Sequence, residues 1–390
     1  MQDLKIGIAG LGAASTLVLP YFERVPGVTL AAAADLRDDA RAEFSATYGW
    51  PAFDDVAALC ASPAVDAVWI ETPNHLHCEH ALLAARAGKH IICAKPLAIS
   101  LFECDQMISA ARGANVRLLQ GHSKIFDPPI QAIRDVVASG RLGAVMQINS
   151  WLFNDWLQRP RLKAELDPAL GGGLIYRQAP HLVDICNFII GRPAQSVRAN
   201  AAGWDPNFDT DGNITASITY DGGATANFLI DAHGFFDVTE LTFGIDGIGR
   251  QRDAASERGR PRRTGPLTEE EKYGRAFRET PPAARRQGDK MPFFGLTIVS
   301  CEKGAIRQSP DGIYVYTAEG RDEIQTPPYL GRAAELFELR DALAEARDVH
   351  PNGAWGKATL EICLAIRDSS CSGRAVPLQH QDGILTPFPS

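Results

Sequence analysis

The sequence has no Cys-x-x-Cys pair, no excess of basic residues and no long apolar run. Its eight cysteines are scattered over 390 residues, which excludes the paired-thiol motifs of zinc ribbons and thiol oxidoreductases. The net charge of −8 leaves no overall basic surface for nucleic acid. No apolar stretch approaches the roughly 18 residues of a membrane-spanning helix. The start of the chain has no basic segment and apolar core typical of a secretion signal. We therefore expect a cytoplasmic protein with reduced thiols that binds neither nucleic acid nor membrane.

Short apolar runs alternate with helical stretches in the first third of the chain. Such strands, apolar on both faces, are typical of a parallel sheet that is covered by helices. Five runs have this character: Leu4–Ala9, Leu30–Asp35, Ala67–Ile70, His90–Cys93 and Val116–Gln120. The pattern predicts an α/β protein that begins with a doubly wound parallel sheet in a domain spanning residues 1–124.

The pattern changes after Asp127-Pro128-Pro129. Strand patterns now dominate, and Gly and Asp residues break them, as in the hairpin signal at 220–223. We expect residues 125–390 to form an α+β domain with a mostly antiparallel sheet. Two expected elements are a strand over Val238–Phe243 and a helix that follows the glycine run 171–173 and continues past His181.

The segment Arg250–Lys290 differs in charge from the rest of the chain. It contains 12 Lys and Arg residues against 7 Asp and Glu residues, and it has few apolar side chains. This composition predicts a basic surface excursion from the second domain.

A glycine turn follows the first predicted strand. Gly10 and Gly12 occupy the first two positions of a G-x-G-x-x-G motif, and the small Ser15 occupies the third. Glycines permit the tight turn and the close approach of a pyrophosphate, and Asp35 stands where an acidic side chain binds ribose hydroxyls. The motif predicts a Rossmann domain that binds NAD. Arg37 could accept a 2′-phosphate, so NADP is the alternative.

Three further segments follow predicted strands or glycine turns, where ligands bind in open α/β sheets. The first, 71–80, holds three histidines, a cysteine and two glutamates, but no second ligand cluster matches it, so we predict no metal site. The second contains Lys95, a lysine directly after a buried strand. The third carries Arg177 and His181, which are four residues apart and would share one helical face.

These motifs together resemble the glucose–fructose oxidoreductase/inositol dehydrogenase (Gfo/Idh/MocA) family. The resemblance rests on the glycine turn, on Thr72-Pro73 followed by His77, on Lys95-Pro96, and on the glycine-led helix with His181 and Asp184. It implies a Rossmann domain followed by an open-faced sheet domain, and a homodimer or homotetramer formed through the sheet domain. It also implies a nicotinamide cofactor, bound by the residues Gly10, Gly12, Ser15, Asp35, Thr72, Pro73, Asn74, His77 and Lys95.

The sequence departs from the family pattern at two informative positions. Ala94 replaces the glutamate that usually precedes the lysine, and Arg177 replaces the aspartate that usually lies four residues before the histidine. Within the family, strings at 121–129, 159–161, 177–181, 264–268 and 355–361 resemble the phthalate 4,5-cis-dihydrodiol dehydrogenase branch. That resemblance implies oxidation of a carboxylated cyclic cis-diol to a ketone that tautomerises to a catechol.

This chemistry needs a base for the hydroxyl proton and cations for the substrate carboxylates. Lys95 and His181 are the candidate catalytic residues. The candidate substrate-binding residues are Arg177, His122, Lys124, Arg159 and Arg161, because arginine and lysine pair with carboxylates. The alternatives are a dehydrogenase of a sugar, sugar acid or inositol, and a dinucleotide-binding regulator without turnover. Lys95 and His181 argue against the regulator, because a protein that only binds the dinucleotide needs no base.

Overall fold

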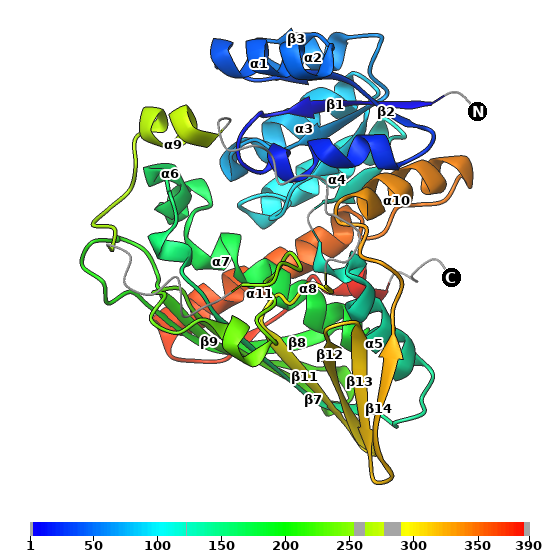
Figure 1. Ribbon diagram of the computed structural model, residues 1–390, viewed down its shortest axis with the longest axis vertical. Coiled ribbons are helices and arrows are strands. Elements are labelled where there is room, and N and C mark those ends of the chain that lie inside the picture. The colour runs from blue at the N-terminus through cyan, green and yellow to red at the C-terminus, as the bar shows by residue number, and fades with distance from the viewer. Residues whose placement is uncertain (1–2, 122, 253–261, 277–289, 386–390) are drawn as a thin grey trace.

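The computed structural model describes residues 3–121, 123–252, 262–276 and 290–385. Two sheets with a helical layer between them form the molecule (Figure 1). The first sheet is parallel and has the strand order β3-β2-β1-β4-β5-β6. Its strands are β1 (Leu4–Ala9), β2 (Val28–Ala34), β3 (Ala52–Phe53), β4 (Ala67–Ile70), β5 (His90–Cys93) and β6 (Leu118–Gln120). The order is that of a Rossmann fold, so the predicted parallel sheet is confirmed.

Helices cover both faces of this sheet, as the apolar strands require. They are α1 (Asp38–Tyr48), α2 (Val56–Ala61), α3 (His77–Arg86) and α4 (Leu101–Gly113). After the glycine turn the chain forms two 3₁₀ helices, η1 (Ser15–Leu17) and η2 (Leu19–Arg24), and not an α-helix. Pro20 explains this, because it has no N–H to donate to the preceding turn.

The second sheet has nine strands in the order β14-β13-β12-β11-β7-β10-β9-β8-β15. Its pairs are antiparallel except for β7 and β10, which confirms the expected mostly antiparallel sheet. The strands are β7 (Val145–Phe153), β8 (Ala194–Ala202), β9 (Asn213–Tyr220), β10 (Thr225–Asp231), β11 (Leu296–Cys301), β12 (Gly304–Ser309), β13 (Gly312–Thr317), β14 (Gly320–Gln325) and β15 (Val376–Pro377).

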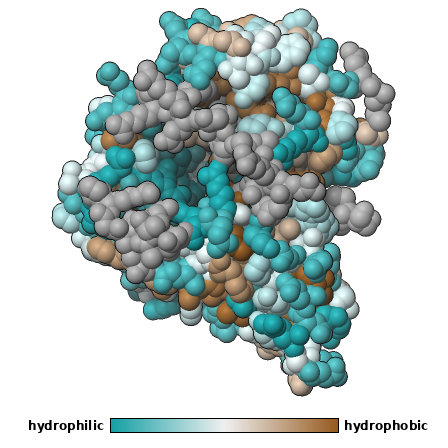
Figure 2. Space-filling model, in the orientation of Figure 1, coloured by the Kyte–Doolittle hydropathy of each residue, from teal (hydrophilic) through white to brown (hydrophobic). Residues whose placement is uncertain are grey.

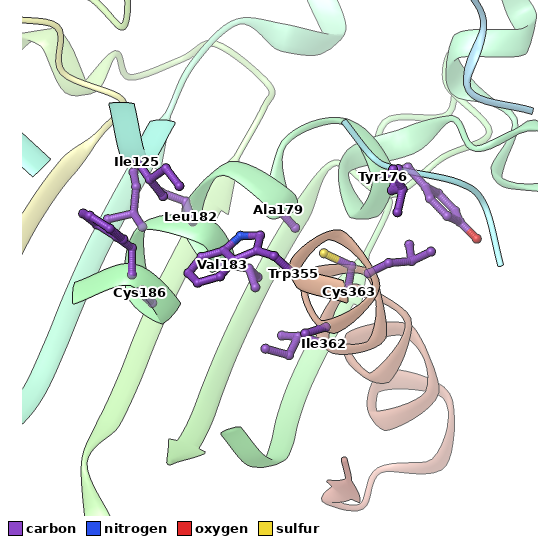
Figure 3. Packing of buried hydrophobic residues seen from close by; sticks show 14 of the residues in the cluster. Ile125, Tyr176, Ala179, Leu182, Val183, Cys186, Trp355, Ile362 and Cys363 are labelled. Atoms are coloured by element: carbon purple, nitrogen blue, oxygen red, sulfur yellow. The ribbon is translucent and has the colours of Figure 1, made fainter. Parts of the chain in front are cut away.

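Buried helices join the two sheets. The helices of this part are α5 (Pro128–Ala138), α6 (Lys163–Leu166), α7 (Gly173–Arg177), α8 (Ala179–Ile190), α9 (Glu269–Ala276), α10 (Ala333–Ala344) and α11 (Gly353–Ser372). Every residue of α8 is buried, and Trp355 of α11 points toward Val183 of α8 (Figure 3). One continuous hydrophobic core therefore runs from α4 through α11 and α8 to the second sheet.

Helix α10 returns from the second half of the chain to the first sheet. Its residues Leu336 and Leu339 belong to the core cluster that contains Ile6 and Ile8 of β1. The division of the chain into two domains at residue 124 stays a prediction. Helix α10, from the second part of the chain, packs against the sheet of the first part.

Two predicted elements differ from the structure. The expected strand Val238–Phe243 is wrong, because residues Val238–Leu241 form the 3₁₀ helix η8. The Asp237 carboxylate accepts the N–H of Thr239, and the Thr242 hydroxyl donates to the carbonyl of Ile245. Such local bonds compete with strand pairing. The helix after the glycine run is broken at Gln178, which separates α7 from α8.

The basic segment Arg250–Lys290 is described in part, and residues 253–261 and 277–289 lie outside the described residues. Residues 262–276 contact the loop before α6: Arg263 donates to Gln158, and Leu267 donates to the carbonyl of Arg161. Helix α9 lies beside α6 in Figure 1. The described residues 262–276 are therefore held against the loop before α6, and the predicted surface excursion of the whole segment stays a prediction.

Candidate active site

The glycine turn is built for close approach to the strand beside it. Gly10 has φ +96°, and a Cβ there would lie 3.0 Å from the main chain of Glu71, at the end of β4. No other residue type combines this dihedral with this contact. The Ser15 hydroxyl, fully buried, donates to the carbonyl of Gly12 at 2.7 Å and closes the turn. The turn therefore fits a dinucleotide pyrophosphate, which Gly10 and Gly12 would bind through their backbone.

Asp35 lies just past the end of β2 and fixes the same turn. Its Oδ2 accepts the Leu11 N–H at 2.8 Å, and its Oδ1 accepts from the Arg37 N–H and Nε at 2.9 and 3.1 Å. The carboxylate is thus placed where it could accept from ribose hydroxyls. Arg37 is engaged with Asp35 and with the carbonyl of Leu11.

The loop after β4 is tied to its neighbours by polar side chains. His77 is fully buried, and its ring nitrogens lie 2.9 Å from the Pro96 carbonyl and 3.0 Å from the Thr72 carbonyl. Burial lowers the pKa of His77 to about 4, so the ring is neutral and donates to one of the two carbonyls. Asn74 Nδ2 donates to the carbonyl of Gly171 at 2.7 Å. These contacts of His77 and Asn74 hold the loop in place, and their predicted role in binding the cofactor stays a prediction.

Lys95 follows β5 and faces the break between α7 and α8. Its Nζ donates to the main-chain carbonyl of Arg177 at 2.7 Å. Burial lowers the pKa of Lys95 to about 7, and the positive charges of Arg177 and Arg332 add to this effect. A lysine in this state can accept a proton near neutral pH.

The break between the two helices makes the Arg177 carbonyl available. In a continuous helix the N–H of His181 would donate to it. Pro180 at the start of α8 prevents the continuous helix, and the His181 N–H donates to the Gln178 carbonyl at 3.2 Å instead. The predicted shared helical face of Arg177 and His181 is therefore wrong, although both residues stay at the site.

His181 lies in the first turn of α8 and is 8% exposed. Its ring centroid is 4.5 Å from that of Phe294, and the Lys124 ammonium lies 5.7 Å from the same Phe294 ring. Lys124 Nζ donates to Asp127 Oδ2 at 3.1 Å and to the Gly247 carbonyl at 2.8 Å. The Lys124 ammonium is thus buried and already bonded within the chain.

Asp184 lies one helical turn after His181 and is fully buried. Its carboxylate accepts four hydrogen bonds from side chains of the first sheet, the following loop and α11: Gln120 Nε2, Ser123 Oγ, Trp355 Nε1 and Thr359 Oγ1. Burial raises the pKa of Asp184 while the four donors oppose the rise. Its charge in turn favours the protonated form of Lys95.

A cluster of three cations surrounds the Glu165 carboxylate. Arg177 Nη2 lies 3.1 Å and Arg161 Nη1 lies 3.5 Å from Glu165 Oε1, and Lys272 of α9 pairs with Oε2. Burial raises the pKa of Glu165, but the charges of Arg177, Arg161 and Lys272 outweigh burial and lower it. Three cations around one carboxylate give the cluster a net positive charge. This charge lies beside Lys95, because Arg177 pairs with Glu165 and also accepts the hydrogen bond from Lys95.

Among the described residues, the predicted substrate residues Arg159 and Lys124 lie outside this cluster. Arg159 is exposed and pairs with Asp155 at 2.7 Å, as in a solvated surface pair. His122 lies outside the described residues. Among the described residues, no group of three or more His, Cys, Asp or Glu could hold a metal ion. No helix within the described ranges is long and apolar enough to cross a membrane.

Glu165 and Lys272 are not among the candidate residues predicted from the sequence. Only the four-residue spacing between Arg161 and Glu165 could have signalled a pair. Lys272 is 107 residues from its partner Glu165, so no local sequence pattern indicates the contact.

Hydrophilic residues surround a hollow beneath the first sheet in the view of Figure 2.

Family models match both parts of the chain. A model described as an oxidoreductase family with an NAD-binding Rossmann fold matches residues 4–122, and the GFO/IDH/MocA C-terminal domain matches residues 130–238. The chain belongs to the GFO/IDH/MocA family. It is therefore an NAD-binding oxidoreductase, and several of its relatives are named dehydrogenases.

Relatives of this GFO/IDH/MocA protein align over nearly its full length. A 1-carboxy-3-chloro-3,4-dihydroxycyclohexa-1,5-diene dehydrogenase of Comamonas testosteroni is 31% identical, and the alignment covers 93% of this chain and 94% of that protein. A solved protein of Bordetella bronchiseptica RB50 is 35% identical, with a TM-score of 0.88 over 97% of this chain and 100% of that one. Levoglucosan dehydrogenase in complex with NADH is 20% identical, has a TM-score of 0.74 over 97% of this chain and 100% of that one, and shares the fold.

Proposed function

We propose that this dehydrogenase oxidises one carbinol of a carboxylated cyclic cis-diol. The observation that carries the proposal is the double role of Arg177. Its carbonyl accepts from Lys95 Nζ at 2.7 Å, and its guanidinium belongs to the cation cluster around Glu165. A proton acceptor and an anion-binding group are thus joined through one residue. The Comamonas relative, named for a carboxylated cyclic diol, supports this substrate class.

The reaction removes one proton and one hydride from the substrate. Lys95, neutral near its pKa of about 7, accepts the hydroxyl proton at Nζ as the carbinol carbon becomes a carbonyl. The bound nicotinamide supplies the hydride acceptor. His181, next to Phe294, lies at the same helix break and is the second candidate for holding the hydroxyl. The ring ketone then tautomerises to the catechol, with no further change in oxidation state.

A substrate panel tests the proposal. The purified protein is incubated with NAD and with cis-dihydrodiols bearing two, one or no carboxylates, together with myo-inositol and a sugar acid. The absorbance of NADH gives kcat/KM for each. We expect the carboxylated cis-dihydrodiols to have the highest values. Faster turnover of inositol or of the sugar acid would favour the carbohydrate alternative, and no turnover of any compound would favour the regulator.

The Arg177→Ala variant tests the anion-binding part. A charge-assisted hydrogen bond contributes about 1.5–3 kcal/mol, so kcat/KM for carboxylated diols should fall about 10- to 150-fold. The neutral diol should lose much less. An equal loss on charged and neutral diols would mean that Arg177 is structural.

We also propose that the protein forms a homodimer or homotetramer through the second sheet. Its β7 strand presents the large apolar side chain of Trp151 to solvent, at 47% exposure. Light scattering should give a mass of two or four chains, and Trp151→Asp should reduce it. A monomeric wild-type protein would refute this assembly.

A further inference from the structure

We infer that Glu165 is a positioning residue that holds Arg161 and Arg177 together as one carboxylate clamp, and that Lys272 of α9 fixes Glu165 for this purpose. The inference rests on the proposed function in taking the ligand of the site to be a carboxylate. It deepens that function, because it explains how this chain selects anionic substrates.

The two oxygens of Glu165 have different tasks. Oε2 accepts the N–H of Leu162 at 2.7 Å and pairs with Lys272, so it is fixed from the side of the protein. Oε1 faces the two arginines, at 3.1 Å from Arg177 and 3.5 Å from Arg161. Because Oε2 is fixed, the whole carboxylate is fixed, and Oε1 sets the position of both guanidinium groups.

Arg161 is held from the other side as well. Its Nε donates to the Trp156 carbonyl at 3.2 Å, and its guanidinium lies 4.5 Å from the centre of the Trp156 ring. Arg177 makes one side-chain hydrogen bond to the described part of the chain, the one to Glu165. Its side chain is 27% exposed, the most open of the cluster, and its other N–H groups can fork onto a ligand carboxylate.

The glycine run places the Glu165 turn against α7. A Cβ on Gly172 would lie 2.7 Å from the main-chain carbon and oxygen of Glu165, so a side chain cannot be accommodated there. The described portion of the basic segment completes the arrangement, because Leu267 pairs with Leu162 and Lys272 reaches Glu165. The segment thus contributes a cation to the site.

Without the Glu165 charge, three cations would repel one another in a confined space. Arg177 would turn toward solvent, and a ligand would have to order it again on binding. Neutralising Glu165 makes the site more positive, yet the inference predicts weaker binding of a carboxylate. A simple effect of net charge would make carboxylate binding tighter. Weaker binding therefore indicates a positioning role for Glu165.

The experiment measures binding of phthalate and of benzoate by calorimetry to the NADH-loaded protein. Glu165→Gln preserves the shape of the side chain and removes its charge. We expect the Kd of phthalate to rise about tenfold or more, as for a lost charge-assisted contact, and the Kd of NADH to stay unchanged. The matched control is Glu270→Gln on the exposed face of α9, which should change the Kd of phthalate by less than about twofold.

A second variant keeps the inference testable if Glu165→Gln does not fold. Lys272→Met removes the cation behind Oε2, and it should raise the Kd of phthalate by about threefold or more. Equal or tighter phthalate binding by Glu165→Gln would overturn the inference, and so would wild-type protein that binds neither phthalate nor benzoate. The turnover panel is independent of these measurements. Failure of the proposed function would appear there, as absent oxidation of cis-diols, while the binding data still decide the role of Glu165.

Discussion

At the scale of single residues, Lys95 shows how its surroundings can lower the pKa of a lysine. A lysine in water is protonated at neutral pH, and Lys95 differs because burial and the charges of three arginines, Arg177, Arg332 and Arg161, oppose its ammonium form. The hydrogen bond to the Arg177 carbonyl fixes Nζ in place. The Arg177 carbonyl thus sets the position of Lys95 Nζ, while burial and the arginine charges set its protonation.

The first prediction concerns the pH dependence of turnover. Because we propose the neutral Lys95 amine as the proton acceptor, kcat for diol oxidation should rise as the pH increases through about 7, the pKa of Lys95. Lys95→Met should lower kcat by about 10²- to 10⁴-fold and abolish this rise, while NADH fluorescence shows unchanged binding. The exposed Lys303→Met variant serves as the control. A Lys95→Met enzyme with near-normal kcat would refute the assignment.

A second prediction concerns Asp35. Asp35→Ser removes the carboxylate that accepts from Leu11 and Arg37, so the glycine turn loosens and Arg37 is released. The ratio of kcat/KM for NAD to that for NADP should fall by about tenfold or more. Initial rates with both cofactors measure the ratio. An unchanged ratio would show that Asp35 does not select the cofactor.

At the scale of elements, the break between α7 and α8 links backbone geometry to the site. Pro180 cannot donate a hydrogen bond, so the helices separate at Gln178 and the Arg177 carbonyl turns to Lys95. Pro180 interrupts the helix and in this way sets where the Lys95 side chain, which comes from the first part of the chain, is held.

The third prediction follows from this break. Pro180→Ala allows one continuous helix, in which the His181 N–H takes the Arg177 carbonyl from Lys95. We expect kcat to fall about tenfold, because a positioned acid–base group is worth that much or more. Thermal unfolding should show no loss of stability, since alanine favours a helix. Pro377→Ala in the edge strand β15 is the control, and unchanged kcat in Pro180→Ala would contradict the role of the break.

At the scale of the whole molecule, Asp184 joins three parts of the structure. Its donors come from β6, from the loop after β6 and from α11, while Asp184 itself belongs to α8. The first sheet and the helical layer are thus connected through one buried carboxylate, close enough to Lys95 to influence its pKa.

The fourth prediction concerns this connection. Asp184→Asn places an amide N–H₂ among four donors, and we expect a loss of about 2–4 kcal/mol in the free energy of unfolding. Because the carboxylate favours protonated Lys95, its removal should also shift the rising limb of kcat to lower pH. Urea denaturation and pH profiles measure both effects. The control is the exposed Asp322→Asn, which should change the free energy of unfolding by less than about 0.5 kcal/mol. If the rising limb of kcat in Asp184→Asn moved to higher pH, the electrostatic argument would be contradicted.

The sequence alone was sufficient for much of the first domain. The apolar runs Leu4–Ala9, Ala67–Ile70 and His90–Cys93 are strands with the same bounds in the structure. They could be recognised because a strand buried on both faces must be apolar throughout. The expected strand at Val238–Phe243 failed because side-chain hydrogen bonds of Asp237 and Thr242 are not visible in an apolar pattern.

The sequence by itself was enough to predict the parallel sheet, the glycine turn with Asp35, and Lys95 and Arg177 as candidates, because each leaves a recognisable pattern in residues that are close along the chain. Only the tertiary structure decided which of the predicted cations share a site. Arg161 and Arg177 meet on Glu165, whereas Arg159 stays with Asp155 at the surface. Lys272 joins them from 107 residues away. Electrostatic energy depends on distance in space, and folding brings together charges that the order of residues keeps apart.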